Sequence, residues 1–192
     1  MMKWIRQFCL ALVVVTLVGT TLRADEVVNW NQMLFRAGLV AGTTPLVITR
    51  NAAIVHAAVF DAVNGIEKRY TPIHVAATGP AGASRDAAAV KAAYTALVAL
   101  YPTPASLKAI FDARLAVSMA LISARDGSAA AASGAGWGET VANAILSWRA
   151  GDHFTDSLPP FLGGSAVGNW RPTPPGNLPG VALLSKNLVD IC

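Results

Sequence analysis

The amino-acid sequence predicts an all-α protein: an antiparallel bundle of about five helices, followed by an extended tail rich in proline and glycine. Stretches rich in Ala, Val and Leu recur from Val27 onward, separated by short breaks that contain proline or glycine. No stretch alternates polar and apolar residues as a half-buried strand does. With 54% hydrophobic residues in a chain of 192, the composition is sufficient for one sizeable core.

Capping residues and helix breakers predict where each helix begins and ends. Thr44 before Pro45 is typical of a helix start, because proline at the first helical position lacks an N–H that would be unpaired anyway. Ser84 is the next predicted N-cap, and Asp86 follows in the first turn, where the helix dipole favours a negative charge. The predicted helices span residues 27–41, 45–66, 84–101, 104–124 and 128–150. Their short connections imply antiparallel neighbours.

Residues 1–24 are typical of a secretory signal peptide. They begin with a basic segment, continue with an apolar stretch from Phe8 to Val18, and end at a small residue, Ala24. The apolar stretch is shorter than the roughly 20 residues that a membrane-spanning helix needs. We therefore expect cleavage, a periplasmic or secreted protein, and no stable membrane span in the mature chain.

The charge of the mature chain argues against a nucleic-acid-binding protein. Loss of residues 1–24 lowers the formal net charge from +4 to +1, because three basic residues and no acidic residue are removed. No stripe of Lys and Arg remains to neutralise phosphates. Cys9 is lost with the signal and Cys192 is the last residue, so no disulfide is expected within the mature chain.

The composition changes sharply after the helical domain, which we place at residues 25–150. Residues 151–192 hold six of the eleven prolines and six glycines, so the helical pattern cannot continue through them. A connector of this length without structure of its own is uncommon, unless it covers a core or leads to another one. We interpret it as an extended tail.

The segment RNAAIVHAAVFDAVNGI, residues 50–66, places His56 and Asp61 in an apolar helix. Five residues separate them, which corresponds to about 140° around a helix, too far apart to share a metal ion or a reaction. Because this helix is apolar on most sides, we expect it to be the central helix of the bundle. We interpret both side chains as buried groups that satisfy a hydrogen bond, for example at a helix terminus or with Arg50, Lys68 or Arg69.

Other polar residues supply no catalytic, cofactor-binding or metal-binding site by their spacing. Asp152, His153 and Asp156 form a possible metal cluster, but three weak ligands in one loop favour a solvated loop. His74 also falls in a loop. No Cys or His pair has the spacing of a zinc site, and no serine lies in a nucleophile elbow. Four tryptophans are interpreted as core or interface anchors: Trp30, Trp137, Trp148 and Trp170.

Small residues follow one face of the last predicted helix. Ala130, Gly134 and Gly138 are four residues apart, and small side chains let helix axes approach closely. This face therefore offers a possible surface for a homo-oligomer.

Four stretches in order resemble a known family. They are VVNWNQMLFRAG, ITRNAAIVHAAVFDAVNGIEKRYTPI, GASRDAAAVKAAYTALVALYP and NWRPTPPG. Together, over residues 27 to 180, they resemble the N-terminal helical half of bacterial vanadium-dependent haloperoxidases and their relatives in the type 2 phosphatidic acid phosphatase superfamily. The resemblance implies a helical protein whose chemistry lies in a later bundle. There, Lys, Arg, a Ser-Gly turn and a histidine hold vanadate or a phosphoryl group.

The catalytic motifs of that family are absent from this chain. In the family they run Lys-x6-Arg-Pro, then Pro-Ser-Gly-His, then Ser-Arg-x5-His-x3-Asp. Here the residue seven before Arg171-Pro172 is Gly164, and Ser133-Gly134 is followed by Ala135. After Ser84-Arg85, Lys91 occupies the histidine position. No catalytic residue is therefore carried over, and vanadate would belong only to a full-length relative.

Two hypotheses about function follow. The first is an exported haloperoxidase-like or phosphatase-like protein that is truncated before its catalytic bundle and inactive on its own. After WRPTPPGNLPG, this chain continues VALLSKNLVDIC, where the family has a segment rich in proline and aromatic residues. The second is a stand-alone periplasmic helical module that binds a partner or self-associates. The sequence leaves open whether a full-length relative would oxidise halides or hydrolyse phosphate esters.

Overall fold

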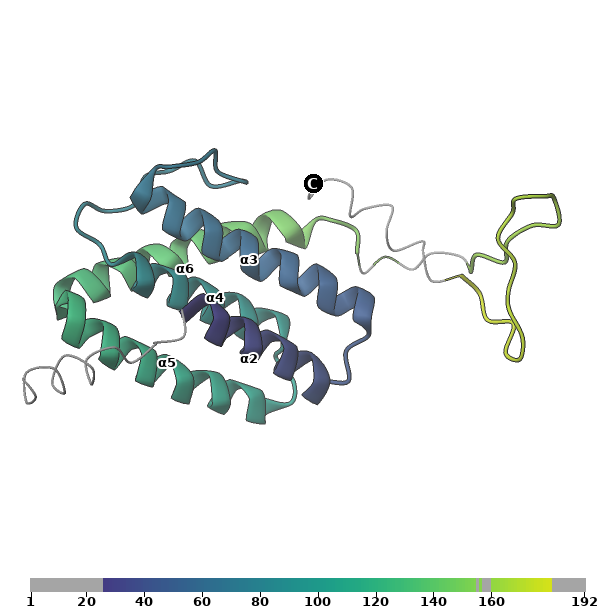
Figure 1. Ribbon diagram of the computed structural model, residues 1–192, viewed down its shortest axis with the longest axis horizontal. Helices are drawn as coiled ribbons and strands as arrows, with labels where there is room; N and C mark the ends of the chain where they lie inside the picture. Colours follow the sequence, from purple (N-terminus) through teal and green to yellow (C-terminus); the bar gives the residue numbers. More distant parts are fainter. Residues whose placement is uncertain (1–25, 155, 157–159, 181–192) are drawn as a thin grey trace, which may run out of the picture.

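Five helices lie alongside one another in the computed structural model, which describes residues 26–154, 156 and 160–180 (Figure 1). They are α2 (Glu26–Val40), α3 (Pro45–Glu67), α4 (Arg85–Leu100), α5 (Ala105–Asp126) and α6 (Ser128–Ala150). No strand occurs among these residues. The predicted all-α class is confirmed, and every helix boundary lies within two residues of its prediction. The predicted signal peptide falls outside the described residues.

The predicted capping residues stand at the starts of α3 and α4. Thr44 is the N-cap of α3 and is followed by Pro45, although the Thr44 side chain makes no capping hydrogen bond. At α4 the Ser84 hydroxyl accepts a hydrogen bond from the backbone N–H of Ala87 at 3.2 Å. Local sequence thus determines both starts, and one of them has a complete side-chain cap.

The central helix is α4, which packs against each of the other four helices. The expectation that α3 is central was wrong. The buried face of α4 consists mainly of alanines, which give a weak apolar signal in sequence but allow neighbouring helices to approach from several sides. The apolar residues of α3 face two ways, partly toward α4 and α6 and partly outward.

The small-residue face of α6 is used inside the chain, against the start of α4. A Cβ atom built on Gly134 would lie 2.1 Å from the Ser84 carbonyl oxygen, and one on Gly138 would lie 2.2 Å from that of Ala88. The Ser84 N–H also donates to the Ala130 carbonyl at 2.9 Å. This face therefore holds two helices of one chain together, and it is not open to a second copy.

The tryptophans differ in their surroundings. Trp30 is buried in the core, where its ring meets Tyr94 edge-on, with the ring centroids 6.2 Å apart. Trp137 and Trp148 are partly buried against the core, and the Trp137 indole N–H donates to the Ala62 carbonyl. In the tail, Trp170 packs on Phe161 with 5.6 Å between the ring centroids.

Within the described residues of the tail, backbone pairing is sparse. Phe161 and Gly180 form one isolated antiparallel bridge, and the Gly164 N–H donates to the Trp170 carbonyl. Turns, bends and residues without regular secondary structure make up the remainder. This agrees with the extended tail that the proline and glycine content predicts.

One helix in the described part of the chain, α3, is long and apolar enough to cross a membrane by length and composition. The most apolar window of this helix has a mean hydropathy of 1.4, and 44% of that window is buried. Core helices of globular domains reach the same values, and the packing of α3 against α4 and α6 provides that burial here.

Candidate functional site

A groove of about 380 Å³ runs along the outward side of α3 in the helical domain. Its lining comes from the start of α2, from α3 and from the loop after α3. The lining residues are Val27, His56, Val59, Phe60, Val63, Asn64, Glu67 and Tyr70. Most of them are apolar or aromatic, as in small-molecule sites.

Two aromatic rings form one part of the lining. Phe60 and Tyr70 lie with 6.2 Å between ring centroids and an angle of 36° between their planes. Asn64 positions Tyr70: its side-chain N–H donates to the Tyr70 carbonyl at 2.7 Å, and its side-chain oxygen accepts from the Tyr70 N–H at 2.9 Å. The backbone of the loop is thus fixed by a buried asparagine of α3.

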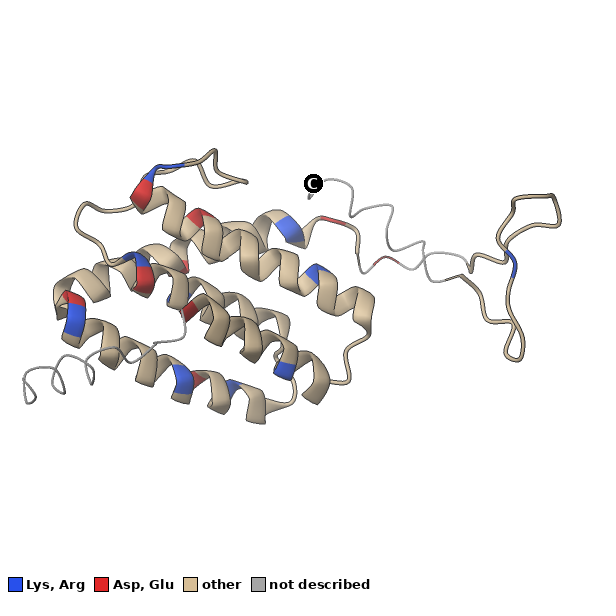
Figure 2. Cartoon of the chain, viewed as in Figure 1, with Lys and Arg blue, Asp and Glu red and all other residues tan. Residues whose placement is uncertain are grey.

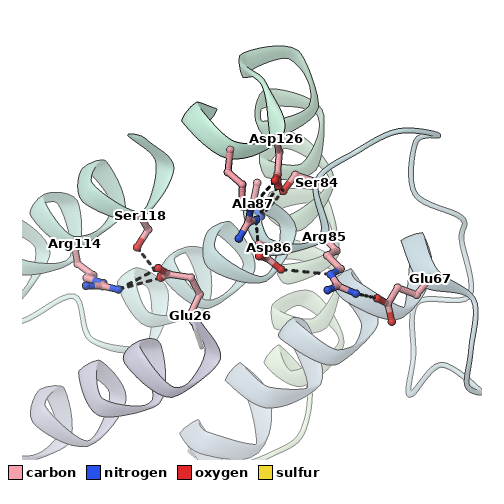
Figure 3. Close-up of polar contacts among 10 residues, drawn as sticks. Glu26, Glu67, Ser84, Arg85, Asp86, Ala87, Arg114, Ser118 and Asp126 are labelled. Carbon is pink, nitrogen blue, oxygen red and sulfur yellow. Dashed lines mark hydrogen bonds and ion pairs between the residues drawn. The ribbon is translucent and has the colours of Figure 1, made fainter. Parts of the chain in front are cut away.

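Among the lining residues, Glu67 is the one carboxylate and His56 the one imidazole, and no Lys or Arg is present. The Glu67 carboxylate is hydrogen bonded to the Arg85 guanidinium, as Figure 3 shows, and Arg69 lies 3.8 Å away. The hydrogen bond and the negative charge of Glu67 raise the pKa of Arg85. Most of α2 and α3 carries no charge, which is visible as tan ribbon in Figure 2.

His56 is exposed and lines this groove, so the expectation of a buried histidine was wrong. Its Nε2 lies 3.1 Å from the side-chain oxygen of Asn31 on α2. In the neutral tautomer that donates from Nε2 to this oxygen, Nδ1 is left with a lone pair. Within the described chain, Nδ1 has no hydrogen-bond partner.

Asp61 is fully buried and faces a different part of the structure. Its carboxylate accepts three backbone N–H groups at 2.8 Å each, from Ile73, His74 and Val75. The buried, hydrogen-bonded role of Asp61 agrees with its interpretation, but the donors are loop amides and not a helix terminus or a basic side chain. His56 and Asp61 are not brought together.

Asp152 belongs to a buried ion-pair cluster, so the expected solvated loop was wrong at this residue. Its Oδ2 lies 2.7 Å from Arg50 Nη2 and 2.9 Å from Arg149 Nη2, and its Oδ1 accepts the Phe154 N–H. Burial alone raises the pKa of Asp152, but hydrogen bonds from Arg50 and Phe154 and the charge of Arg50 together lower it. No local pattern indicates the contact with Arg50, because Arg50 is 102 residues away.

The remaining residues of that predicted group stay at the surface. His153 Nδ1 lies 2.9 Å from Asp156 Oδ2, and both side chains are exposed. His74, in the loop after α3, stacks on Trp148 with 4.5 Å between ring centroids. Among the described residues, no group of three His, Cys, Asp or Glu side chains could hold a metal ion.

The residues tested against the family motifs lie on separate elements. Lys91 of α4 pairs with Glu139 at 3.5 Å, Gly134 is pressed against α4, and Arg171 donates to the Ser165 carbonyl in the tail. Each is engaged locally. The structure does not bring them together as a cradle for an oxyanion.

No match to the chain is found among protein-family models, curated proteins or solved structures.

The outward face of α2 carries three exposed apolar side chains beside the exposed polar residues Gln32 and Arg36. Val28, Phe35 and Leu39 follow one another at spacings of seven and four residues, which places them on one side of the helix. All three are largely exposed, Leu39 to 79%. A surface helix normally turns polar residues outward, so this apolar stripe indicates an interaction surface.

Proposed function

We propose that this chain is an exported, non-catalytic helical scaffold that corresponds to the N-terminal half of a haloperoxidase-like or type 2 phosphatidic acid phosphatase-like protein. The apolar stripe of α2, formed by Val28, Phe35 and Leu39, is the observation that carries the proposal. In half of a larger fold, such a stripe is the surface on which the remaining helices pack. The ordered family-like stretches between residues 27 and 180 support the same assignment.

The proposed lack of catalytic activity is supported by the places of the candidate anion-binding residues. An oxyanion site needs several fixed cationic donors around one point. Lys91 and Arg171 lie on α4 and in the tail, and each already has a partner. The chain alone is therefore expected to oxidise no halide in the presence of vanadate and peroxide, and to hydrolyse no phosphate ester.

A stand-alone periplasmic helical module is the second candidate, and the closed core favours it. Residues 26–150 bury a continuous set of apolar side chains from all five helices. A domain that completes its own core can fold without further helices. In this case the stripe on α2 would bind a separate partner or a second copy, because the small-residue face of α6 is already occupied.

The nucleotide sequence beyond codon 192 tests the scaffold proposal most directly. Translated in all frames, it should encode Lys-x6-Arg-Pro and then Ser-Gly-His. Absence of both motifs would contradict the proposal and favour the stand-alone module. Export is tested separately by the N-terminus of the protein recovered from the periplasm, which should begin near Asp25.

The behaviour of the purified chain supplies a second test. If the α2 stripe normally packs against further helices, the chain should self-associate, and Phe35→Ser with Leu39→Ser should reduce its mass in light scattering toward that of a monomer. Val117→Ser on α5 also removes an exposed apolar side chain and should leave the mass unchanged. A wild-type chain that is monomeric and melts cooperatively would favour the stand-alone module.

A further inference from the structure

We propose that the groove on the outward side of α3 binds a small, neutral aromatic molecule that carries an N–H or O–H donor, and that Nδ1 of His56 accepts this donor. This site is distinct from the apolar stripe of α2 and does not depend on the scaffold proposal. Its ligand class follows from three properties of the groove: its size, its charge and the polar atoms of its lining that have no partner within the described residues.

The size and lining select a small apolar body. A volume of about 380 Å³ lies at the lower end of the range for pockets that hold small organic ligands. Val59 and Val63 supply an aliphatic surface, and Phe60 and Tyr70 supply two rings. An aromatic ring placed against them gains from both apolar burial and ring–ring contact.

The charge of the lining disfavours anionic ligands. No Lys or Arg lines the groove, and the one carboxylate, Glu67, is already paired with Arg85. An anionic group would have to leave water without a cation in the lining to compensate it, and the Glu67 charge would repel it. A neutral ligand avoids both penalties.

Few polar side-chain atoms of the lining are without a hydrogen-bond partner within the described residues. The side-chain amide of Asn64 is hydrogen bonded to the backbone of Arg69 and Tyr70 in the following loop. Two lining side chains keep an unpaired polar atom within the described residues, the Tyr70 hydroxyl and the His56 imidazole. Tyr70 is 65% exposed, whereas the His56 ring is held by Asn31. In the neutral tautomer whose Nε2 donates to Asn31, Nδ1 of His56 is an acceptor on a ring that this contact holds in place.

Two fluorescent probes that share one aromatic body test the proposal. N-phenyl-1-naphthylamine is neutral and has one N–H, and 8-anilino-1-naphthalenesulfonate adds only an anionic sulfonate. The wild-type chain should bind the neutral probe saturably with one site per chain, and the sulfonate at least about tenfold more weakly. Equal affinities for the two probes, or no saturable binding of the neutral one, would overturn the proposal.

Variants locate the binding site. Tyr70→Ala removes an exposed ring, so the chain should stay folded while its affinity for the neutral probe falls about fivefold or more. Val63→Trp fills the groove and should abolish binding. His56→Phe keeps an aromatic side chain but removes the ring nitrogens, and it should lower the affinity for the neutral probe. Circular dichroism shows which variants are folded. Because Tyr70→Ala changes a loop surface residue, an unchanged affinity in that folded variant would by itself refute the site.

Leu39→Ser is the matched control for the α2 stripe. It removes the most exposed apolar side chain of that stripe and does not touch the groove lining. Its affinity for the neutral probe should equal that of the wild type. If Leu39→Ser loses the probe and Tyr70→Ala does not, the probe binds the stripe and the groove proposal fails, whereas the scaffold proposal is unaffected.

Discussion

Arg50 and Asp152 form a buried ion pair that joins the start of α3 to the residues just after α6, with 2.7 Å between Nη2 and Oδ2. Arg149 shares the same carboxylate oxygen. Arg50 also donates to the Arg149 carbonyl and stacks over the Phe154 ring at 4.4 Å. One carboxylate thus compensates two guanidinium groups and fixes the direction in which the chain leaves the bundle.

Asp152→Asn should therefore be strongly destabilising. It leaves two largely buried guanidinium groups without a counter-charge, which costs about 3 kcal/mol in comparable buried pairs. The free energy of unfolding from a urea titration measures the loss. Asp156→Asn is the matched control, because its pair with His153 is exposed, and it should change stability by less than about 0.5 kcal/mol. Similar losses in the two variants would contradict the burial of the cluster.

Asp126 makes the stability of the domain depend on pH in the acidic range. Hydrogen bonds from Arg125 and then from Ser84 lower the pKa of Asp126 to about 2, against an ordinary value of about 3.9 in the unfolded chain. A carboxyl with a lowered folded pKa contributes stability above pH 4, and the contribution is lost as pH falls toward 2. Asp126→Asn should thus be less stable than wild type at pH 6. The difference should disappear as pH falls below 2, and a difference that persists there would contradict the assignment.

Figure 3 shows why Asp126 has this role. In that view Asp126 accepts a hydrogen bond from the Ser84 hydroxyl at 2.6 Å. Asp126 also pairs with Arg125, which in turn pairs with Asp86. The cluster thereby joins the first turn of α4 to the last turn of α5. In the same view, Glu26 of α2 accepts from Arg114 and Ser118 of α5.

Asp61→Ala should loosen the loop after α3. It removes the acceptor for three backbone N–H groups around His74, and each bond to a charged group contributes on the order of 1.5 to 3 kcal/mol before water replaces part of it. A net loss of about 3 kcal/mol is expected, with faster hydrogen exchange at the amides of residues 73–75. His56→Leu breaks one exposed hydrogen bond and should cost less than about 1 kcal/mol. An equal cost in the two variants would show that the loop does not depend on Asp61.

Helix ends could be predicted because their causes are local. A cap such as Ser84 and its partner Ala87 lie three residues apart, so the sequence contains the whole interaction. A buried carboxylate such as Asp61 must likewise be hydrogen bonded, but its donors lie 12 to 14 residues later and depend on how the loop folds back. Arg50, the partner of Asp152 on α3, is 102 residues away, and no local pattern identifies it.

The groove could not be predicted, because its walls come from two helices and a loop. The sequence predicts a buried His56 because its helix is apolar on most sides. In the structure, His56 instead lines the groove together with Phe60 and Val63. Periodicity reveals a stripe but does not tell whether another helix covers it. The alanine-rich α4 has a weak apolar pattern, yet it takes the centre because small side chains let four neighbours approach.

Two glycines in α6 test how closely α6 approaches α4. A Cβ on Gly138 would lie 2.2 Å from the Ala88 carbonyl oxygen, whereas one on Gly136 would meet nothing within 4 Å. Gly138→Ala must push two backbones apart and should destabilise the domain by about 2 kcal/mol or more. Gly136→Ala should stabilise it by about 0.5 to 1 kcal/mol, because alanine loses less conformational entropy in a helix. Thermal and urea unfolding of both variants measure the contrast. If Gly138→Ala is as stable as Gly136→Ala, the two helices do not approach through this face.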